Sequence, residues 1–199
     1  MSVTLTKFLD FVNATGLKKR NIVLETVSQE EYAPYKDFYK NLREAIISLH
    51  KSNKSVDTLT NIIPWTAEIK KKHYNELISG YQKWAKSKRI SFIEEKSALF
   101  SLGGIELSIN PELIININKK PTVVKLYFKQ DKLGKNAADM ITVLMAMAFC
   151  STFDNYDTFD YAVLDIRCGR LWRITETTPI DEIKAVLENE AKSWYNYQN

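Results

Sequence analysis

One short segment near the middle of the chain carries side chains that could act together on a ligand. In residues 123–129 every second side chain is polar, and these are Lys125, Tyr127 and Lys129. Side chains of a β-strand point alternately to the two faces of a sheet, so this pattern predicts a strand with one apolar face and one Lys-Tyr-Lys face. Lysines can contact phosphates, and a tyrosine can stack on a base or donate a hydrogen bond.

Two glutamates are candidates for the opposite charge on this face. Glu106 and Glu112 lie on the strand-like sequence that precedes the segment. Lysines that become buried need partners, and these nearby acids are the obvious ones. Two interpretations remain open. The group is either a polar site in the centre of the sheet, or an exposed face with cross-strand Glu–Lys pairs worth roughly a few tenths of a kcal/mol each.

A second basic group lies at the end of a helix predicted over residues 66–89. It consists of Lys83, Lys86, Lys88 and Arg89. The formal net charge of the whole chain is +4, too small to indicate a nucleic-acid partner by itself. Residues 1–96 hold 17 basic and 11 acidic side chains (+6), whereas residues 97–199 hold 11 and 13 (−2). The basic first half indicates either a solvated lysine-rich surface or a surface that meets phosphates.

Several common chemistries are excluded by what the sequence lacks. It has no glycine-rich phosphate-binding loop, and its two histidines and two cysteines show no metal-ligand spacing, so no metal site is expected. Two cysteines are too few for a disulfide framework, and we expect reduced, buried thiols in a cytoplasmic protein. The longest apolar stretch, about ten residues at 140–149, is too short to cross a bilayer, so no membrane partner is expected.

The elements that must position these side chains follow from the hydrophobic periodicity. A capping box at 28–31 and apolar residues at helical spacing over 35–49 predict that roughly the first 65 residues are helical. After the helix at 66–89 the period changes to that of strands, which predicts a three-stranded antiparallel meander. Its strands cover 97–109 (broken at Gly103-Gly104), 112–118 and 122–129. Further elements are a buried helix at 136–151, strands at 160–167 and 170–174, and a helix that starts near Thr178.

This order of elements predicts an α/β fold. The expected architecture is a central mixed sheet, made of the meander, a crossover helix and two further strands, with helices on its faces. Residues 1–65 are predicted to form a helical N-terminal extension packed on a core of residues 66–199, the two making one globular unit.

Residues 66–174 resemble the core of the PD-(D/E)XK nuclease-like superfamily in this order of elements. Pro111-Glu112, followed by apolar residues 113–115, is similar to the family's Pro-Asp before an apolar strand, and segment 123–129 takes the place of its acid-x-Lys strand. In the family, acids on these two strands hold Mg²⁺ and the lysine orients a water. The resemblance implies that Glu112 and Lys129 are the catalytic positions. The acid of the family's third strand is missing, because Lys125 or Tyr127, depending on register, occupies its place.

Three functions remain open from the sequence. The first is a catalytically degenerate nuclease-like protein, without a cofactor, that binds nucleic acid or another phosphate-bearing ligand through the two lysine groups, Tyr127 and Glu106. The second is a non-catalytic interaction or accessory module, such as a homo-oligomer, whose aromatic residues form a partner surface. These aromatic residues are Tyr32, Tyr35, Tyr39, Tyr81, Trp84, Trp194, Tyr195 and Tyr197. The third is an active Mg²⁺-dependent nuclease that uses Glu106, Glu112 and Lys129.

Overall fold

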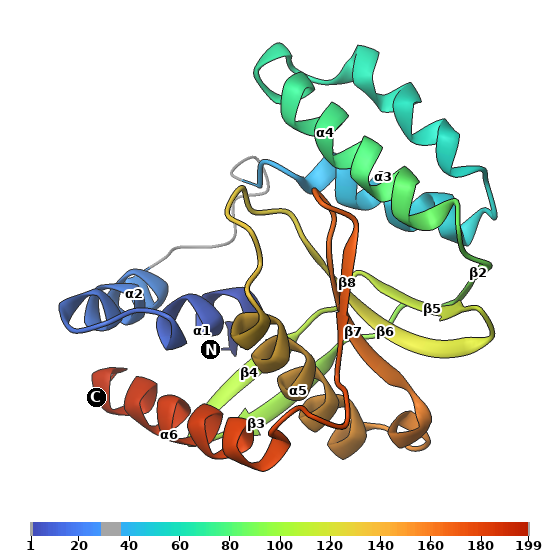
Figure 1. The fold of residues 1–199 in the computed structure, drawn as a ribbon. Coiled ribbons are helices and arrows are strands. Elements are labelled where there is room, and N and C mark those ends of the chain that lie inside the picture. Colours follow the sequence, from blue (N-terminus) through green and yellow to red (C-terminus); the bar gives the residue numbers. More distant parts are fainter. Residues whose placement is uncertain (1, 29–36, 199) are drawn as a thin grey trace.

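The structure is a computed structural model that describes residues 2–28 and 37–198 (Figure 1). Within these residues, two β-sheets are flanked by helices. The larger sheet has five strands in the order β2-β5-β6-β7-β8. Their bounds are Ile90–Glu94 (β2), Leu113–Ile117 (β5), Lys120–Tyr127 (β6), Asp160–Asp165 (β7) and Arg170–Arg173 (β8).

The larger sheet combines antiparallel and parallel pairs. Strands β2, β5 and β6 form an antiparallel meander. Helix α5 (Lys135–Thr152) then carries the chain from β6 to β7, which is parallel to β6, and β8 returns antiparallel to β7. A parallel pair needs such a crossover because the chain must travel back along the strand. The predicted mixed α/β class is confirmed, together with the crossover helix and the final pair of strands.

The smaller sheet corrects the expected meander. Its order is β1-β4-β3, with β1 at Ser2–Thr4, β3 at Ala98–Leu102 and β4 at Ile105–Ile109. The segment 97–109 is therefore a hairpin and not one strand, because Gly103 and Gly104 both take a positive φ and turn the chain. Strand β2 takes the expected place of this segment in the meander, and β1 pairs in parallel with β4.

The other helices gather in two groups (Figure 1). Helices α1, α2 and α6 contact one another beside the smaller sheet, whereas α3, η2 and α4 pack together next to the larger one. The predicted helices lie close to these positions, although α4 ends four residues earlier than expected and the capping box at 28–31 extends beyond the described residues. The bounds are Leu5–Val12 (α1), Leu17–Ser28 (α2), Lys40–Lys51 (α3), Val56–Trp65 (η2), Glu68–Ala85 (α4), Tyr156–Thr158 (η3) and Ile180–Gln198 (α6).

Two hydrophobic cores cover opposite faces of the larger sheet, and β6 shows how they divide. Val124 and Leu126 pack in the core that contains residues of α3 and α4. Val123 belongs to the core that contains residues of α1 and α5, and Tyr127 packs against the same core. The alternation predicted for this strand is confirmed, and it directs Tyr127 to the face covered by α1 and α5.

The aromatic side chains expected to form a partner surface are divided between core and surface. Tyr81, Trp84 and Trp194 are buried, whereas Tyr195 and Tyr197 on α6 are exposed. Tyr32 and Tyr35 lie outside the described residues. The expectation of buried thiols is wrong: Cys150 and Cys168 are free and exposed, because each lies near or beyond the end of its element rather than in the middle of it.

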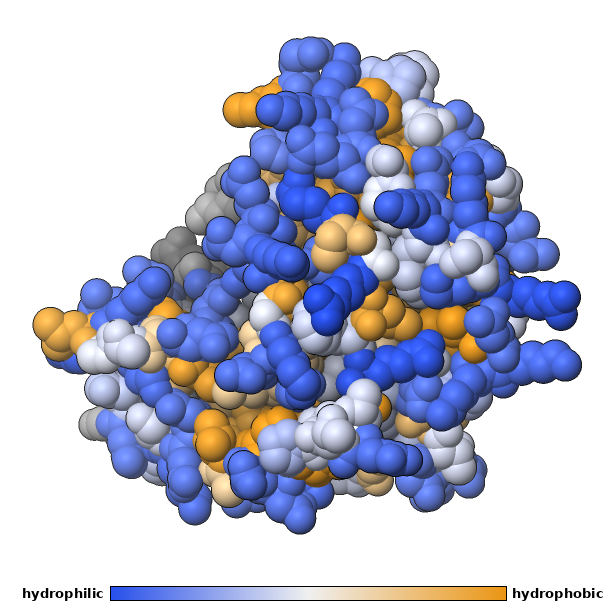
Figure 2. All heavy atoms as spheres, viewed as in Figure 1, coloured by the Kyte–Doolittle hydropathy of each residue, from blue (hydrophilic) through white to orange (hydrophobic). Residues whose placement is uncertain are grey.

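The molecular surface is largely hydrophilic in the view of Figure 2, with apolar atoms visible below its centre, where α5 and α6 lie in Figure 1. In the part of the chain that the structure describes, no helix combines the length and the apolar character that crossing a membrane requires.

A buried histidine makes the stability of this fold depend on pH. His50 on α3 is 8% exposed, and its Nε2 contacts the hydroxyl group of Tyr81. Burial lowers the pKa of His50 to about 4, whereas an unfolded histidine titrates near pH 6.5. As the pH falls from 6.5 toward 4, the unfolded chain takes up a proton that the folded protein does not, so stability present above pH 6.5 is lost across this window. We expect His50 to lower the free energy of unfolding by about 2 kcal/mol between pH 7.5 and pH 5.

Urea unfolding at pH 7.5 and pH 5 measures this contribution. His50→Gln is the control, because glutamine can bond to Tyr81 and does not titrate in this range. The variant should lose about 2 kcal/mol less than the native protein over the same pH interval. An equal loss in both proteins would show that His50 does not carry this pH dependence.

Candidate functional site

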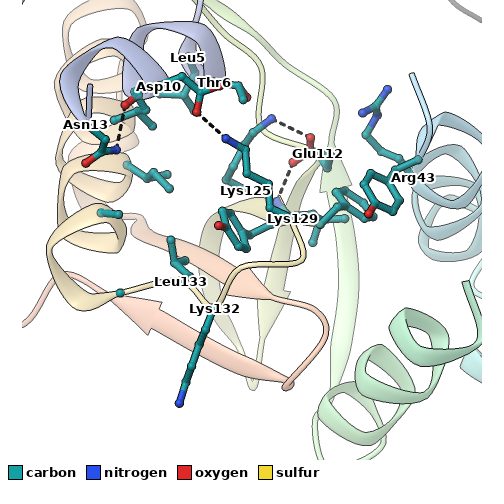
Figure 3. Close-up of a pocket in the computed structure, with 18 residues that line it drawn as sticks. Leu5, Thr6, Asp10, Asn13, Arg43, Glu112, Lys125, Lys129, Lys132 and Leu133 are labelled. Carbon is teal, nitrogen blue, oxygen red and sulfur yellow. Dashed lines mark hydrogen bonds and ion pairs between the residues drawn. The ribbon is translucent and has the colours of Figure 1, made fainter. Parts of the chain in front are cut away.

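A cavity of about 410 Å³ lies where β6 ends and α5 begins (Figure 3). Helix α1, the start of β5 and the first turns of α3 and α5 complete its wall. Ligands of α/β proteins commonly bind outside the carboxyl ends of strands next to a crossover helix, which is where this cavity lies. The charged residues among its lining are Asp10, Arg43, Glu112, Lys125, Lys129 and Lys132.

The pairing register of the sheet brings Glu112 beside Lys125. Leu113 of β5 is opposite Val124 of β6 in an antiparallel pair, so the residues one step further, Glu112 and Lys125, also meet. Pro111 and Glu112 lie just before β5 begins. The register of β5 against β6 thus places the acid at the floor of the cavity.

Both oxygens of Glu112 are engaged. Its Oε1 accepts a hydrogen bond from Lys125 Nζ (2.7 Å), and its Oε2 accepts one from the backbone N–H of Leu126 (2.7 Å). Lys125 Nζ also donates to the carbonyl oxygen of Asn110 (2.8 Å). The Glu112 side chain is 7% exposed and that of Lys125 is 16% exposed, so this ion pair is largely removed from water. A buried pair of this kind holds both side chains in fixed positions.

A second ion pair crosses the cavity between distant parts of the chain. Lys129, just beyond β6, pairs with Asp10 of α1. Figure 3 shows the two side chains directed toward each other across the opening, whereas Lys132 points away from the cavity. The side chains of Lys129 and Asp10 are 47% and 42% exposed. An exposed pair contributes less than about 1 kcal/mol, so a competing anion can separate it at low cost.

Tyr127 also lines the cavity. Burial raises the pKa of its hydroxyl group, and the neighbouring negative charges of Asp131, Asp165 and Asp10 raise it further. Tyr127 therefore stays protonated at neutral pH and can donate a hydrogen bond to an anionic ligand.

The other side of the cavity is aromatic and apolar. Tyr39 stacks on Phe128, with ring centroids 5.3 Å apart and an angle of 18° between the planes. Arg43, one turn further along α3, also lines the cavity and forms an ion pair with Asp37. Aliphatic side chains from α1, from β6 and from around the start of α5 complete the lining, and these are Leu5, Leu9, Leu126, Leu133, Ala137 and Ile141.

The structure brings together only part of the predicted site. Lys125, Tyr127, Lys129 and Glu112 line one cavity. Glu106 does not belong to it, because it lies in the middle of β4 in the other sheet, opposite Ser2 and Ser101, and is exposed. The polar-site interpretation of the Lys-Tyr-Lys face fits this geometry better than an exposed sheet face does.

The basic group at the end of α4 is also separate from the cavity. Lys86 pairs with Asp57 (2.8 Å), and Lys88 Nζ donates to the carbonyl oxygen of Trp84 (2.8 Å). Burial lowers the pKa of Lys88, and the nearby charge of Arg173 lowers it further. Arg89 lines a shallow depression at the edge strand β2, and Lys83 lies on α4.

Several residues of the cavity are not predicted from the sequence as members of the site, and three of them carry its chemistry. Asp10, Tyr39 and Arg43 belong to helical segments far from residues 112–129 along the chain. The sequence suggests Tyr39 only as part of an aromatic partner surface. No local pattern distinguishes these residues from other positions on helices, and only the packing of α1 and α3 on the sheet reveals them.

The residues present do not fit a Mg²⁺ site. This ion requires oxygen ligands, most often carboxylates. Among the described residues, no group of three or more His, Cys, Asp or Glu side chains is arranged to hold a metal ion. The ammonium group of Lys125 lies 2.7 Å from Glu112 and would repel a cation near this carboxylate.

Comparison with known proteins shows a likeness in structure but not in sequence. No protein-family model matches the chain, and no curated protein matches it. The crystal structure of a "Putative exonuclease" from Eubacterium rectale is similar over 100% of this chain and 81% of that one, with a TM-score of 0.58 and 12% sequence identity. At this identity the likeness concerns the fold alone, an α/β fold that the two proteins share.

Proposed function

We propose that this protein binds nucleic acid, or another phosphate-bearing ligand, in the cavity at the end of β6 without cleaving it by metal-dependent chemistry. The observation that carries the proposal is the bond between Lys125 and Glu112. In the register that aligns Lys125 with the family's third-strand acid, a lysine bonded to Glu112 takes the place of a metal-binding carboxylate. A phosphate can still be held there by lysines, although it would not be activated for cleavage.

The order of elements supports a distant relation to that superfamily. Helix α4, strands β2, β5 and β6, helix α5 and strand β7 occur in the order of the family core, with the β3-β4 hairpin inserted between β2 and β5 and with Pro111-Glu112 just before β5. The structural neighbour described as a "Putative exonuclease" shares the fold of this chain, which is compatible with a nuclease-like protein. We infer that the chain is catalytically degenerate, because Lys125 stands where such nucleases have a metal-binding acid.

The charges of the cavity support an anionic ligand. Four basic and two acidic side chains line it, with Lys132 as the basic residue that points outward. Asp10 is the acid that a phosphate can replace, since its pair with Lys129 is half exposed. Tyr127 supplies a neutral hydrogen-bond donor beside them.

Salt-dependent binding of a labelled single-stranded oligonucleotide tests this function. For two phosphate contacts, the affinity should fall about sevenfold between roughly 50 mM and 200 mM salt. Lys129→Gln should weaken binding and reduce that dependence to about threefold, because one contact is lost. Lys54→Gln is the matched control, since Lys54 is an exposed lysine outside the cavity. Binding that does not depend on salt, or that is equally weakened by both variants, would contradict the proposal.

A cleavage assay tests the alternative that the protein is an active nuclease. The oligonucleotide is incubated with the protein and Mg²⁺, and the products are separated on a gel. We expect no cleavage. Cleavage that disappears in a folded Glu112→Gln variant would show that this cavity is catalytic. A stable oligomer in light scattering with no affinity for the oligonucleotide would instead favour the interaction module.

A further inference from the structure

We propose that the cavity accepts a single nucleotide unit, with its phosphate on Lys129 in place of Asp10 and its base against the Tyr39–Phe128 pair. This inference rests on the proposed function, and it names the ligand unit and the orientation in which that unit lies. It also assigns a role to Asp10 as an internal competitor for the phosphate.

The size of the cavity favours one nucleotide unit over a length of duplex. Its volume is about 410 Å³, within the range of roughly 300–1,000 Å³ that is typical of small-ligand pockets. Its walls come from four sides, namely α1, β6, α3 and α5. A groove for duplex would have to be open along its length, whereas α1 spans this site through the pair of Asp10 with Lys129 (Figure 3).

The aromatic wall is suited to a flat base. The rings of Tyr39 and Phe128 are stacked, with only 18° between their planes. Phe128 is only 8% exposed and supports the Tyr39 ring, so a base would stack on Tyr39. Every base has a π-face, and such stacking gives affinity with little dependence on sequence. Leu5 and Leu9 of α1 add apolar surface from the other side of the cavity. A simple phosphate or sugar phosphate would leave this half of the cavity unused.

The ionic side is suited to a phosphate because it already holds a carboxylate. Asp10 binds Lys129 from α1, which places an anion at the position where we expect the phosphate. The Tyr127 side chain lines the same part of the cavity. A ligand phosphate must displace Asp10, so Asp10 lowers the apparent affinity for any anion at this position.

Titration calorimetry with small ligands tests the inference on the whole protein. The probes are AMP, ribose 5-phosphate, adenosine and inorganic phosphate. We expect AMP to bind at least about tenfold more tightly than each of the other three, because only AMP uses both sides of the cavity. Affinity for AMP equal to that for ribose 5-phosphate would overturn the placement of the base.

Two substitutions separate the two sides of the cavity. Tyr39→Ala should weaken AMP about tenfold and leave ribose 5-phosphate unchanged, because only the base contacts this wall. Asp10→Asn should strengthen AMP binding severalfold and leave adenosine unchanged, because the competing anion is gone. Asp57→Asn is the control, since Asp57 forms an exposed ion pair with Lys86 outside the cavity. If Tyr39→Ala fails to fold, Asp10→Asn still decides, and unchanged or weaker AMP binding in that variant would overturn the role of Asp10.

The result also distinguishes this inference from the proposed function. Salt-dependent oligonucleotide binding without any preference for AMP over ribose 5-phosphate would leave the proposed function in place and refute the nucleotide orientation. Absence of binding to both the oligonucleotide and AMP would refute both.

Discussion

Lys125→Met should destabilise the protein by about 3–5 kcal/mol, although the residue lines a cavity and not a close-packed core. The variant leaves the carboxylate of Glu112, whose side chain is 7% exposed, without its positive partner. It also removes the donor to the carbonyl oxygen of Asn110. A charge left alone in a largely buried position costs more than the pair itself contributes, because desolvation is no longer compensated. Chemical denaturation of the two proteins at neutral pH measures the difference.

Lys129→Met is the matched control for this prediction. It removes the same side chain from the same cavity, but its partner Asp10 is 42% exposed and stays hydrated, so the loss should be below about 1 kcal/mol. The double variant Lys125→Met/Glu112→Gln should recover part of the loss, because it removes the unpaired charge. Equal losses at positions 125 and 129 would mean that the Glu112–Lys125 pair is solvated and does not fix the floor of the cavity.

Gly80→Ala should destabilise the protein by about 3 kcal/mol or more, at the upper end of overpacking effects. Gly80 lies inside α4, where an alanine would ordinarily stabilise the helix by about 1 kcal/mol. A Cβ atom at this position would overlap the backbone carbonyl oxygen of Ile166 and would lie 2.7 Å from that of Arg167. Both are backbone atoms next to the end of β7 and cannot turn away as a side chain can. The free energy of unfolding in urea gives the size of the effect.

Gly134→Ala provides the comparison for this substitution. A Cβ atom at Gly134 would meet no heavy atom within 4 Å, and the φ of −81° there is one that alanine adopts without strain. We expect a change below about 1 kcal/mol at this position. A small effect at both positions would mean that α4 can move away from the sheet, and that the close approach at Gly80 does not determine how the helix docks.

The strand of the site could be predicted because its signal is local. Alternation of polar and apolar residues in 123–129 follows from the geometry of any strand, and it determines which side chains share a face. Helix α5 and the hairpin of β7 and β8 could be predicted for the same reason. The apolar residues that indicate the helix, and the turn residues that indicate the hairpin, lie within a few positions of one another. The prediction for the first strand of the meander was wrong because Gly103-Gly104 turns the chain, and sequence spacing does not say which strand pairs with which.

The sequence by itself determined the α/β class, the two faces of β6 and the presence of Glu112 near a lysine-bearing strand. Only the tertiary structure decided that Glu112 pairs with Lys125, that Glu106 lies in another sheet, and that Asp10 and Tyr39 complete the cavity. The physical reason is the range of the interactions. Periodicity and turns act between residues a few positions apart, whereas the cavity joins residues separated by more than a hundred positions, as in the pair of Asp10 and Lys129. Such contacts depend on how whole helices pack against the sheet, which no local pattern encodes.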